Sequence, residues 1–342
     1  MIPTSPAVVT RRRRRRPLPG INAVSLGLAV AVLGSGGLLL ATRQKADSVE
    51  RVEELAGVLT VDVGPFENYL LVGSDTREGA DPSDPDFGGI GDTDEVQGRR
   101  SDTMMVLHVD YERDTASLLS IPRDLWVEID GDGENRINTA YQEGADTLVR
   151  TVQDALGIPI HHYIEVDFQS FKEIVGAIGG VEACFVAPTR DRNTGLLVPT
   201  EGCFVLDPVQ ALQYARSRHF EEFVYGEWFE DPRADLGRIE RQQEFVQSAI
   251  DAALAQARSN PLRASELIDA AARSLRVDPR TDLVEVIDRL LPLADGALAR
   301  YSLPVEGTEI DDKAVLVMLD DAEALLAYFA GTGPPPPVTS TP

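Results

Sequence analysis

The pattern of apolar and polar residues divides the chain into an uncharged N-terminal stretch and a longer region of short strand-like and helix-like segments. Residues 21–42 hold no charged side chain over 22 positions. At about 1.5 Å per residue, a helix of this length spans the roughly 30 Å hydrocarbon core of a bilayer. Six consecutive arginines at 11–16 precede it, and such basic blocks mark the cytoplasmic side. We therefore expect a single-pass anchor in the cell membrane, with a cytoplasmic N-terminus and an extracytoplasmic C-terminal domain.

Two other interpretations of this region are weaker. A cleavable signal peptide has a shorter apolar region of about 7–15 residues, followed by an Ala-x-Ala-like site, and no convincing site follows Leu40. The arginine block could also bind nucleic acid, but beside a hydrophobic span membrane topology explains it better. The expected layout is a basic cytoplasmic tail (1–20), a transmembrane anchor (21–42), a helical stalk (43–64), an exported domain (65–331) and a disordered proline-rich tail (332–342).

Within the exported domain, β-rich runs alternate with segments of helical spacing. The expected strands cover 69–73, 104–109, 116–121, 163–166 and 181–186, and the expected helices cover 147–156, 168–178 and 236–255. A polar turn between the second and third strands is typical of a hairpin. The segment 163–186 predicts a strand–helix–strand unit with two glycines ending its helix. We therefore predict an α/β fold with a central mixed β-sheet flanked by helices.

Charge and cysteine content narrow the function classes. The net charge of -24 argues against nucleic acid as a partner, because such proteins present basic surfaces to phosphates. The only two cysteines, Cys184 and Cys203, lie beyond the hydrophobic span. Outside the cytoplasm such a pair usually forms a disulfide. The four histidines show no zinc-ligand spacing with the cysteines or with each other.

Arginines concentrate in one part of this acidic chain. Arg216 and Arg218 are two residues apart, so on an extended segment they point the same way. Arg238, Arg241 and Gln242 are three and four apart, so on a helix they share a face. Arginine binds phosphate bidentately and keeps its charge. This spacing favours a pyrophosphate site, and the alternative is a set of solvated arginines paired with the abundant carboxylates.

Further polar residues flank the predicted strands. Asp75 follows the first strand, Arg100 and Asp102 precede the second, and Arg123 follows the third. Ligand sites in α/β proteins favour strand ends, and two carboxylates there can hold a hard divalent ion that also touches phosphate oxygens. The structural alternative is a turn role for Asp102 and a surface ion pair for Arg123 with Asp124.

Short motifs occur in order along residues 65–330. They are 73–77 (GSDTR), 100–104 (RSDTM), 120–124 (SIPRD), 136–141 (RINTAY), 166–168 with 179–181, 214–218 (YARSR) and 235–243 (DLGRIERQQ). With these motifs behind an expected anchor, the chain resembles the LytR-CpsA-Psr family of membrane-anchored cell-wall glycopolymer transferases, in an actinobacterial form. The resemblance implies an LCP-type domain that moves a glycopolymer, as its sugar phosphate, from a polyprenyl-pyrophosphate carrier to a peptidoglycan hydroxyl.

The resemblance also implies roles for individual residues. Asp75 and Asp102 would bind Mg²⁺. The pyrophosphate would be held by five arginines: Arg100, Arg123, Arg216, Arg218 and Arg238. Arg241 and Gln242 would support it, and Asp235 would position the arginines or assist the metal. The catalytic set would be Asp102, Arg123, Arg218 and Asp235, with either aspartate as candidate base. Phosphoryl transfer depends mainly on positioning and charge neutralisation, which these residue types supply.

Three segments leave alternatives open. The apolar face of helix 168–178 either lines a trough for the prenyl chain or is ordinary core; its residues are Phe168, Phe171, Ile174, Val175 and Ile178. Residues 78–98 form an insert expected to be a surface loop. A second insert, 220–234, carries five aromatic and five acidic residues, and we expect it to form a lid or a glycan-binding rim.

Alternative functions also remain at this stage. The same pocket could hydrolyse a polyprenyl pyrophosphate, or the protein could be a non-enzymatic cell-wall regulator or scaffold. A DNA-binding regulator is disfavoured, because the domain is expected to be exported and acidic. The sequence leaves the polymer open between arabinogalactan, teichoic acid and capsule, and it makes no prediction of oligomeric state.

Overall fold

The computed structural model describes residues 48–61, 64–74, 101–233, 235–259, 261–290 and 298–337. All of them belong to the compact unit formed by residues 43–342. The expected anchor at 21–42 and the insert at 78–98 lie outside the described residues. Among the described helices, none combines the length and the apolar character needed to cross a membrane.

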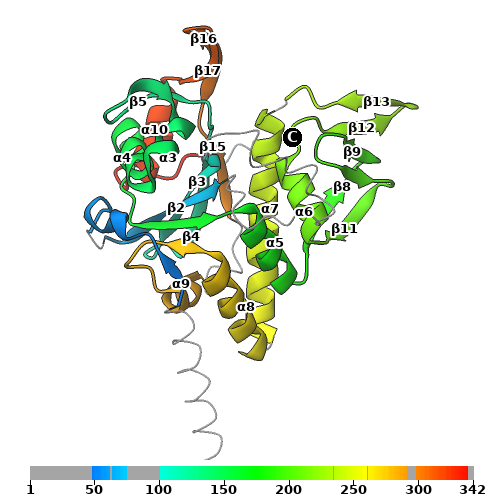
Figure 1. Cartoon of the computed structure of the whole chain (residues 1–342), viewed down its shortest axis with the longest axis horizontal. Helices are drawn as coiled ribbons and strands as arrows, with labels where there is room; N and C mark the ends of the chain where they lie inside the picture. Colours follow the sequence, from blue (N-terminus) through cyan, green and yellow to red (C-terminus); the bar gives the residue numbers. More distant parts are fainter. Residues whose placement is uncertain are drawn as a thin grey trace, which may run out of the picture. The chain divides into compact units, whose positions relative to one another are not determined.

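The described residues form a central seven-stranded sheet (Figure 1). Its strands, in spatial order, are β1 (Glu50–Arg51), β14 (Arg276–Val277), β7 (His162–Val166), β2 (Phe66–Ser74), β3 (Ser101–Asp110), β4 (Thr115–Ile121) and β15 (Ala299–Ser302). β2 and β7 are parallel, as are β4 and β15, whereas β2–β3 and β3–β4 are antiparallel. The predicted mixed sheet and the hairpin within it are therefore confirmed.

Alternation along the central strands builds two cores, one on each face of the sheet. One face packs on the 3-10 helices η1 (Glu53–Gly57) and η2 (Ile137–Thr139) and on α3 (Ala140–Glu143), α4 (Ala145–Leu156) and α10 (Ala322–Phe329). The other face packs on α7 (Asp235–Ser259) and α9 (Leu283–Leu290), with α8 (Pro261–Ser274) beside α7. Thus Leu70 and Val72 face the first layer while Tyr69 and Leu71 face the second. The helices predicted at 147–156 and 236–255 are confirmed.

A second group of elements follows β7. It comprises α5 (Phe168–Ala177), α6 (Pro208–Arg216), the ribbon of β8 (Val181–Phe185) with β11 (Gly202–Leu206), and a four-stranded sheet of β10 (Leu196–Val198), β9 (Thr189–Asp191), β12 (Glu221–Val224) and β13 (Glu227–Glu230). Cys184 and Cys203 are cross-strand partners in the ribbon and form the expected disulfide. Two further hairpins are β5 (Trp126–Ile129) with β6 (Gly133–Arg136), and β16 (Val305–Ile310) with β17 (Lys313–Met318).

The strand–helix–strand unit predicted over 163–186 is wrong as a unit. Its elements exist, but β8 pairs with β11 and does not join the central sheet. Gly179 and Gly180 have φ of 80° and 98° and turn the chain away after α5. At Gly180 a Cβ atom would lie 2.8 Å from the carbonyl oxygen of Leu206, so only glycine permits this close approach.

The two ends of the domain bear on two further expectations. Residues 48–61 do not form a helical stalk: β1 pairs with β14, and Val52, Leu55 and Leu59 are buried in the core. A helix here would place Val49, Val52, Ala56 and Leu59 on one stripe, but Ala56 is exposed while the other three are buried. At the other end, the proline-rich residues 334–337, expected to be disordered or extended, form no helix or strand, and the Tyr301 hydroxyl donates to the carbonyl of Pro336 at 3.0 Å. Both segments are part of the folded domain.

Candidate functional site

A cavity of about 710 Å³ lies between the C-terminal half of β2, its neighbours β3 and β7, and helices α5, α6 and α7. Most of its wall is apolar, with Leu71, Met105 and Ile164 from the sheet and Phe245 and Ile250 from α7. All five apolar side chains that we expected to line a trough do line this cavity: Phe168, Phe171, Ile174, Val175 and Ile178. The apolar face of α5 is therefore a cavity wall.

Residues at the two ends of α5 determine where this wall begins and ends. The Asp167 side chain accepts a hydrogen bond from the backbone N–H of Ser170 at 2.7 Å, which caps the first turn of α5. The glycine pair after Ile178 ends the helix. Between these limits the apolar residues recur at three- and four-residue spacing, so they share the face turned to the cavity.

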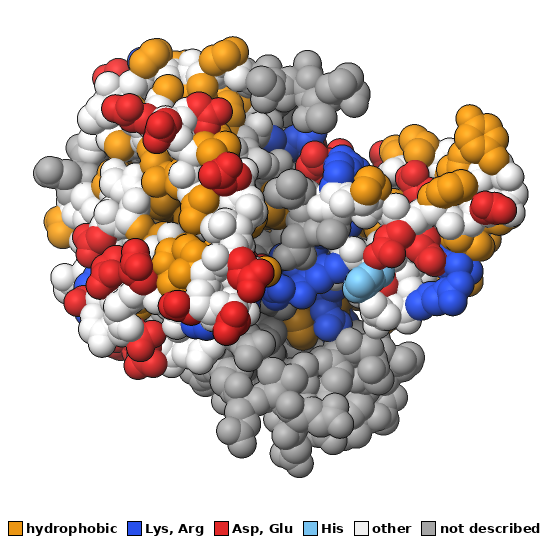
Figure 2. All heavy atoms as spheres, turned by 90° about the horizontal axis from the view of Figure 1, so that it is seen from above, with side chains coloured by type: hydrophobic (Ala, Val, Ile, Leu, Met, Phe, Trp, Pro, Cys, Tyr) orange, Lys and Arg blue, Asp and Glu red, His pale blue; other side chains and the backbone are white. Residues whose placement is uncertain are grey.

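Arginines gather at one part of the cavity wall. Arg216, Arg218 and Arg238 line it, together with Gln242 and His219. Figure 2 shows basic side chains gathered in a hollow of the surface, beside a lobe with exposed hydrophobic side chains. The predicted site residues of the two arginine motifs therefore meet at one cavity. Its basic part suits a polyanion, and its apolar part suits a hydrocarbon.

The extended geometry predicted for Arg216 and Arg218 is only half right. Arg216 is the last residue of α6, and its guanidinium lies 4.5 Å from the centroid of the Phe168 ring. Ser217 leaves the helix with φ and ψ of -63° and 123°. Both arginines still reach the cavity because the helix ends between them.

A buried aspartate that sequence reasoning missed shapes this turn. Asp191, in β9, accepts hydrogen bonds from the Ser217 hydroxyl at 2.6 Å and from the backbone N–H groups of Arg218 at 3.1 Å and His219 at 3.0 Å. Burial raises the pKa of Asp191, but these and other hydrogen bonds outweigh it and lower the pKa. Asp191 is therefore an ionised positioning residue for the segment that carries Arg218.

Helix α7 divides its polar residues between two roles. Arg238 and Gln242 line the cavity, whereas Arg241 is buried and donates to Asp231 at 3.1 Å and to the carbonyl of Ser217 at 2.9 Å. Gln242 donates to the carbonyl of Ala215 at 3.0 Å. These carbonyls belong to the end of α6, where helix acceptors lack intrahelical partners. Arg241 therefore supports the end of α6 from behind and does not line the cavity.

Further predicted motifs meet at one edge of the sheet, at the end of β2, the beginning of β3 and the end of β4. Gly73 pairs with Thr103 and Ser74 with Ser101, with a bulge between the two pairs that contains Asp102. Met104 pairs with Ile121, so the end of β4, which leads to Arg123, is at this edge too. Gly73, Ser74 and Thr103 line the cavity. The edge that contains the position of Asp102 therefore borders the cavity.

The side chains at this edge are only partly described. Asp75 and Arg100 lie outside the described residues, and Asp102 and Asp235 are described only as positions in β3 and at the start of α7. Arg123 forms an ion pair with Asp124 at 3.3 Å and is not among the described residues that line the cavity. Among the described side chains, no group of three or more His, Cys, Asp or Glu could hold a metal ion.

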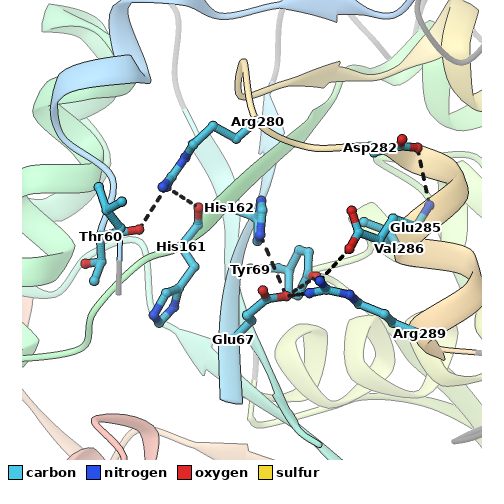
Figure 3. Close-up of a pocket in the computed structure, with 11 residues that line it drawn as sticks. Thr60, Glu67, Tyr69, His161, His162, Arg280, Asp282, Glu285, Val286 and Arg289 are labelled. Atoms are coloured by element: carbon cyan, nitrogen blue, oxygen red, sulfur yellow. Dashed lines mark hydrogen bonds and ion pairs between the residues drawn. The ribbon is translucent and has the colours of Figure 1, made fainter. Parts of the chain in front are cut away.

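A second, smaller cavity of about 140 Å³ lies on the same face of the sheet, near the start of β2 (Figure 3). Glu67 is buried there and accepts from the hydroxyls of Tyr69 at 2.8 Å and Tyr111 at 2.6 Å, and it pairs with Arg289 and His162. Burial raises the pKa of Glu67, but these partners outweigh it and hold the pKa well below its usual range. This satisfied network ties β2 to β7 and α9 and is structural.

Comparison with known proteins gives consistent results. A family model described as the LytR_cpsA_psr family matches residues 40–327. The cell wall biosynthesis protein LcpB of Corynebacterium glutamicum is 30% identical over 316 residues, covering 91% of this chain and 72% of that protein. The polyisoprenyl-teichoic acid–peptidoglycan teichoic acid transferase TagU of Halalkalibacterium halodurans is 31% identical over 310 residues, covering 89% of this chain and 93% of that protein.

The fold agrees with this result. A LytR-Csp2A-Psr enzyme from Actinomyces oris superposes with a TM-score of 0.63 at 25% identity, covering 82% of this chain and 96% of that structure. The matched segment of the family model includes the central sheet, the cavity and both arginine motifs. The chain therefore belongs to the LytR-CpsA-Psr family, as its motifs indicated.

Proposed function

We propose that this protein transfers a glycopolymer, as its sugar phosphate, from a polyprenyl-pyrophosphate carrier to a hydroxyl of peptidoglycan. One observation carries the proposal: a single cavity of about 710 Å³ combines a long apolar wall with Arg216, Arg218 and Arg238. This arrangement matches a ligand with a hydrocarbon tail and a doubly charged phosphate head. The names of relatives such as TagU, a teichoic acid transferase, support the same reaction class.

The arginines would act by position and charge. When the sugar phosphate is transferred, the bond between the two phosphates breaks and negative charge grows on the lipid phosphate that leaves. Guanidinium groups fixed near the non-bridging oxygens stabilise that charge more than they stabilise the bound substrate. Asp191 and Arg241 hold the turn after α6 in place, so Arg218 needs little reorganisation during the reaction. Arg100 and Arg123 would add positive charge from the sheet edge.

Asp75 and Asp102 are the residues that we propose as magnesium ligands. Asp102 lies in the bulge opposite the end of β2, and Asp75 directly follows that end in the sequence. Carboxylate oxygens from one or two residues, completed by substrate phosphates and water, are the ligands that Mg²⁺ prefers. Asp75 and Asp102 would hold the ion, which when bound would neutralise charge on the pyrophosphate oxygens. Asp235 or Asp102 would accept the proton of the incoming hydroxyl.

The N-terminal anchor would place the domain where its carrier lipid is. Residues 21–42 would cross the membrane once, with the arginines at 11–16 in the cytoplasm. The exported domain would then lie on the side of the membrane where peptidoglycan is.

The test uses the full-length chain in detergent, with a polyprenyl-pyrophosphate-linked saccharide and a peptidoglycan oligomer, and weighs the products by mass spectrometry. We expect a phosphodiester-linked adduct with the wild type and with Arg150→Ala, a matched control on α4 that pairs with Asp146. In Arg218→Ala the adduct should fall by about 10²–10³-fold at unchanged Tm. Lipid phosphate released without adduct would indicate a hydrolase instead. Bound lipid without any turnover would indicate a scaffold.

A further inference from the structure

The β12–β13 hairpin carries an aromatic residue where folding favours a different one. Its turn consists of Tyr225 and Gly226, with φ of 56° and 89°. Two-residue turns of this kind prefer Asn or Gly at the first position, because bulky side chains rarely adopt positive φ. Tyr225 is 98% exposed, so packing does not compensate. The ring at this tip is therefore accessible to a ligand.

More aromatic surface lies on one face of the hairpin. Phe223 and Trp228 are cross-strand partners with ring centroids 5.2 Å apart, and cross-strand partners share a face. The guanidinium of Arg190 stacks on Trp228 at 3.9 Å. Glu221 and Glu230 are also cross-strand partners. Each lies two residues from Phe223 or Trp228, on the side away from the turn, so this pair belongs to the same face. We call this surface, formed by Glu221, Phe223, Trp228 and Glu230, the aromatic face.

The composition of the aromatic face suits a sugar. The C–H groups on the flat side of a pyranose ring pack against the electron-rich face of an aromatic ring. Sugar hydroxyls need hydrogen-bond acceptors and donors beside that ring, and carboxylates and guanidinium groups supply them. Phe223 is 39% exposed, so part of its ring is open to a ligand.

The aromatic face is continuous with the arginine site. Nδ1 of His219 lies 2.6 Å from Oε1 of Glu230, and His219 lines the cavity beside Arg218. A glycan joined to a pyrophosphate at Arg218 must leave the cavity there. It is tethered at that point and runs outward, so it can meet the rings one after another along the hairpin. An acceptor needs to bring only one hydroxyl to the same place, which makes the donor glycan the better match.

Charge indicates the class of glycan. Residues 221–230 include four glutamates and no lysine or arginine. Two of these, Glu222 and Glu227, lie on the opposite face of the hairpin. The nearby Arg190 and Arg192 both pair with Glu221, so the aromatic face carries no surplus of positive charge. A polymer with a phosphate in every repeat would gain no net electrostatic attraction from this face, whereas an uncharged polysaccharide needs none.

We propose that the aromatic face and Tyr225 bind the glycan of the donor, and that this glycan is an uncharged polysaccharide and not a polyol phosphate. The inference rests on the proposed function, because the donor reaches the hairpin only if its pyrophosphate is bound at the arginines.

The experiment measures steady-state transfer by the full-length protein with three donors on the same polyprenyl pyrophosphate: a single sugar, a long neutral oligosaccharide and a polyol-phosphate oligomer. Tyr225→Asn removes the ring and supplies a residue that the turn prefers. Phe223→Ala removes a ring of the aromatic face, and Phe229→Ala is the matched control on the opposite face, where Phe229 is 52% exposed.

We expect KM for the neutral oligosaccharide to rise about tenfold, equal to ~1.4 kcal/mol, in Tyr225→Asn and Phe223→Ala but not in Phe229→Ala. KM for the single-sugar donor should stay constant in all three variants, and Tyr225→Asn should keep or raise Tm. Equal KM values for every donor and variant would overturn the inference while leaving the proposed function intact. So would a rise in KM for the peptidoglycan acceptor alone, or a polyol-phosphate donor used as well as the neutral one. If the wild type used no donor, the proposed function would fail first.

Discussion

A larger side chain on α7 that fills part of the cavity should weaken the binding of a lipid without weakening the binding of pyrophosphate. Ala249 is partly buried and lines the apolar wall. In Ala249→Phe the new ring would occupy space that is open in a cavity of about 710 Å³. Because the ring enters a void and buries apolar surface, it should not overpack the core. We expect the Tm of the variant to equal or exceed that of the wild type.

The loss of lipid affinity follows from the hydrocarbon that the ring displaces. A buried methylene contributes about 0.8 kcal/mol, so excluding roughly one five-carbon isoprenoid unit costs about 3–4 kcal/mol. That corresponds to about 10²–10³-fold in Kd for a polyprenyl pyrophosphate. Inorganic pyrophosphate, which has no tail, should bind the arginines with unchanged affinity.

The assay is isothermal titration of the full-length protein with both ligands. Ala255→Phe is the matched control, since Ala255 lies on the same helix but is exposed, and both affinities should remain at wild-type values. Wild-type affinity of Ala249→Phe for the polyprenyl ligand, at an unchanged Tm, would refute the placement of the lipid in this cavity.

Three further predictions concern single groups. Arg218→Lys should lower transfer by about 10–100-fold at constant Tm, because an ammonium cannot bind phosphate bidentately; an unchanged rate would exclude a direct contact. The disulfide joins Cys184 to Cys203 across a sequence separation of 19, so its reduction should destabilise the domain by about 3 kcal/mol. A reductant should therefore lower the Tm of the wild type and leave the Tm of Cys184→Ser unchanged. Burial lowers the pKa of His108 from 6.5 to about 4, so this group destabilises the fold progressively as pH falls from 6.5 to 4, by about 3 kcal/mol in total. Urea denaturation across this pH range should show that slope in the wild type and lose it in His108→Asn.

Local patterns predicted most of the central fold, and long-range pairing was where they failed. Patterns among neighbouring residues were enough to predict five elements of the central fold. Apolar runs predicted the strands β2, β3 and β4, and helical spacing predicted the helices α4 and α7. The spacing of Val49, Val52 and Leu59 also fits a helix, but β1 pairs with β14 more than two hundred residues away. Similarly, the apolar run of β8 shows a strand without showing which sheet it joins. Periodicity identifies a buried face and contains no information about the partner.

The same limit applies to the candidate site. Arginine spacing identified Arg216, Arg218 and Arg238, which the fold brings to one cavity. The spacing of Arg241 on the helix was right, yet its side chain turns to Asp231. Asp191 carries no local signal, because its role depends on three groups more than twenty residues further along the chain. A residue that holds a backbone turn can be found only once the turn and its partner are both placed.

The distribution of burial along α5 favours a cavity wall for part of its apolar face, while Val175 and Ile178 belong to a hydrophobic core. In a core helix the apolar face is fully covered, as in α4, where six of twelve residues are buried. Within α5 only Val175 is buried, while Phe168, Phe171 and Ile174 keep partial exposure to the cavity. Apolar side chains that remain partly exposed within a wall contribute less to folding than their transfer free energy allows. Covering the exposed part of this face with a hydrocarbon would bury more apolar surface and so favour binding. In our proposal the prenyl chain therefore completes a hydrophobic core that the polypeptide leaves open.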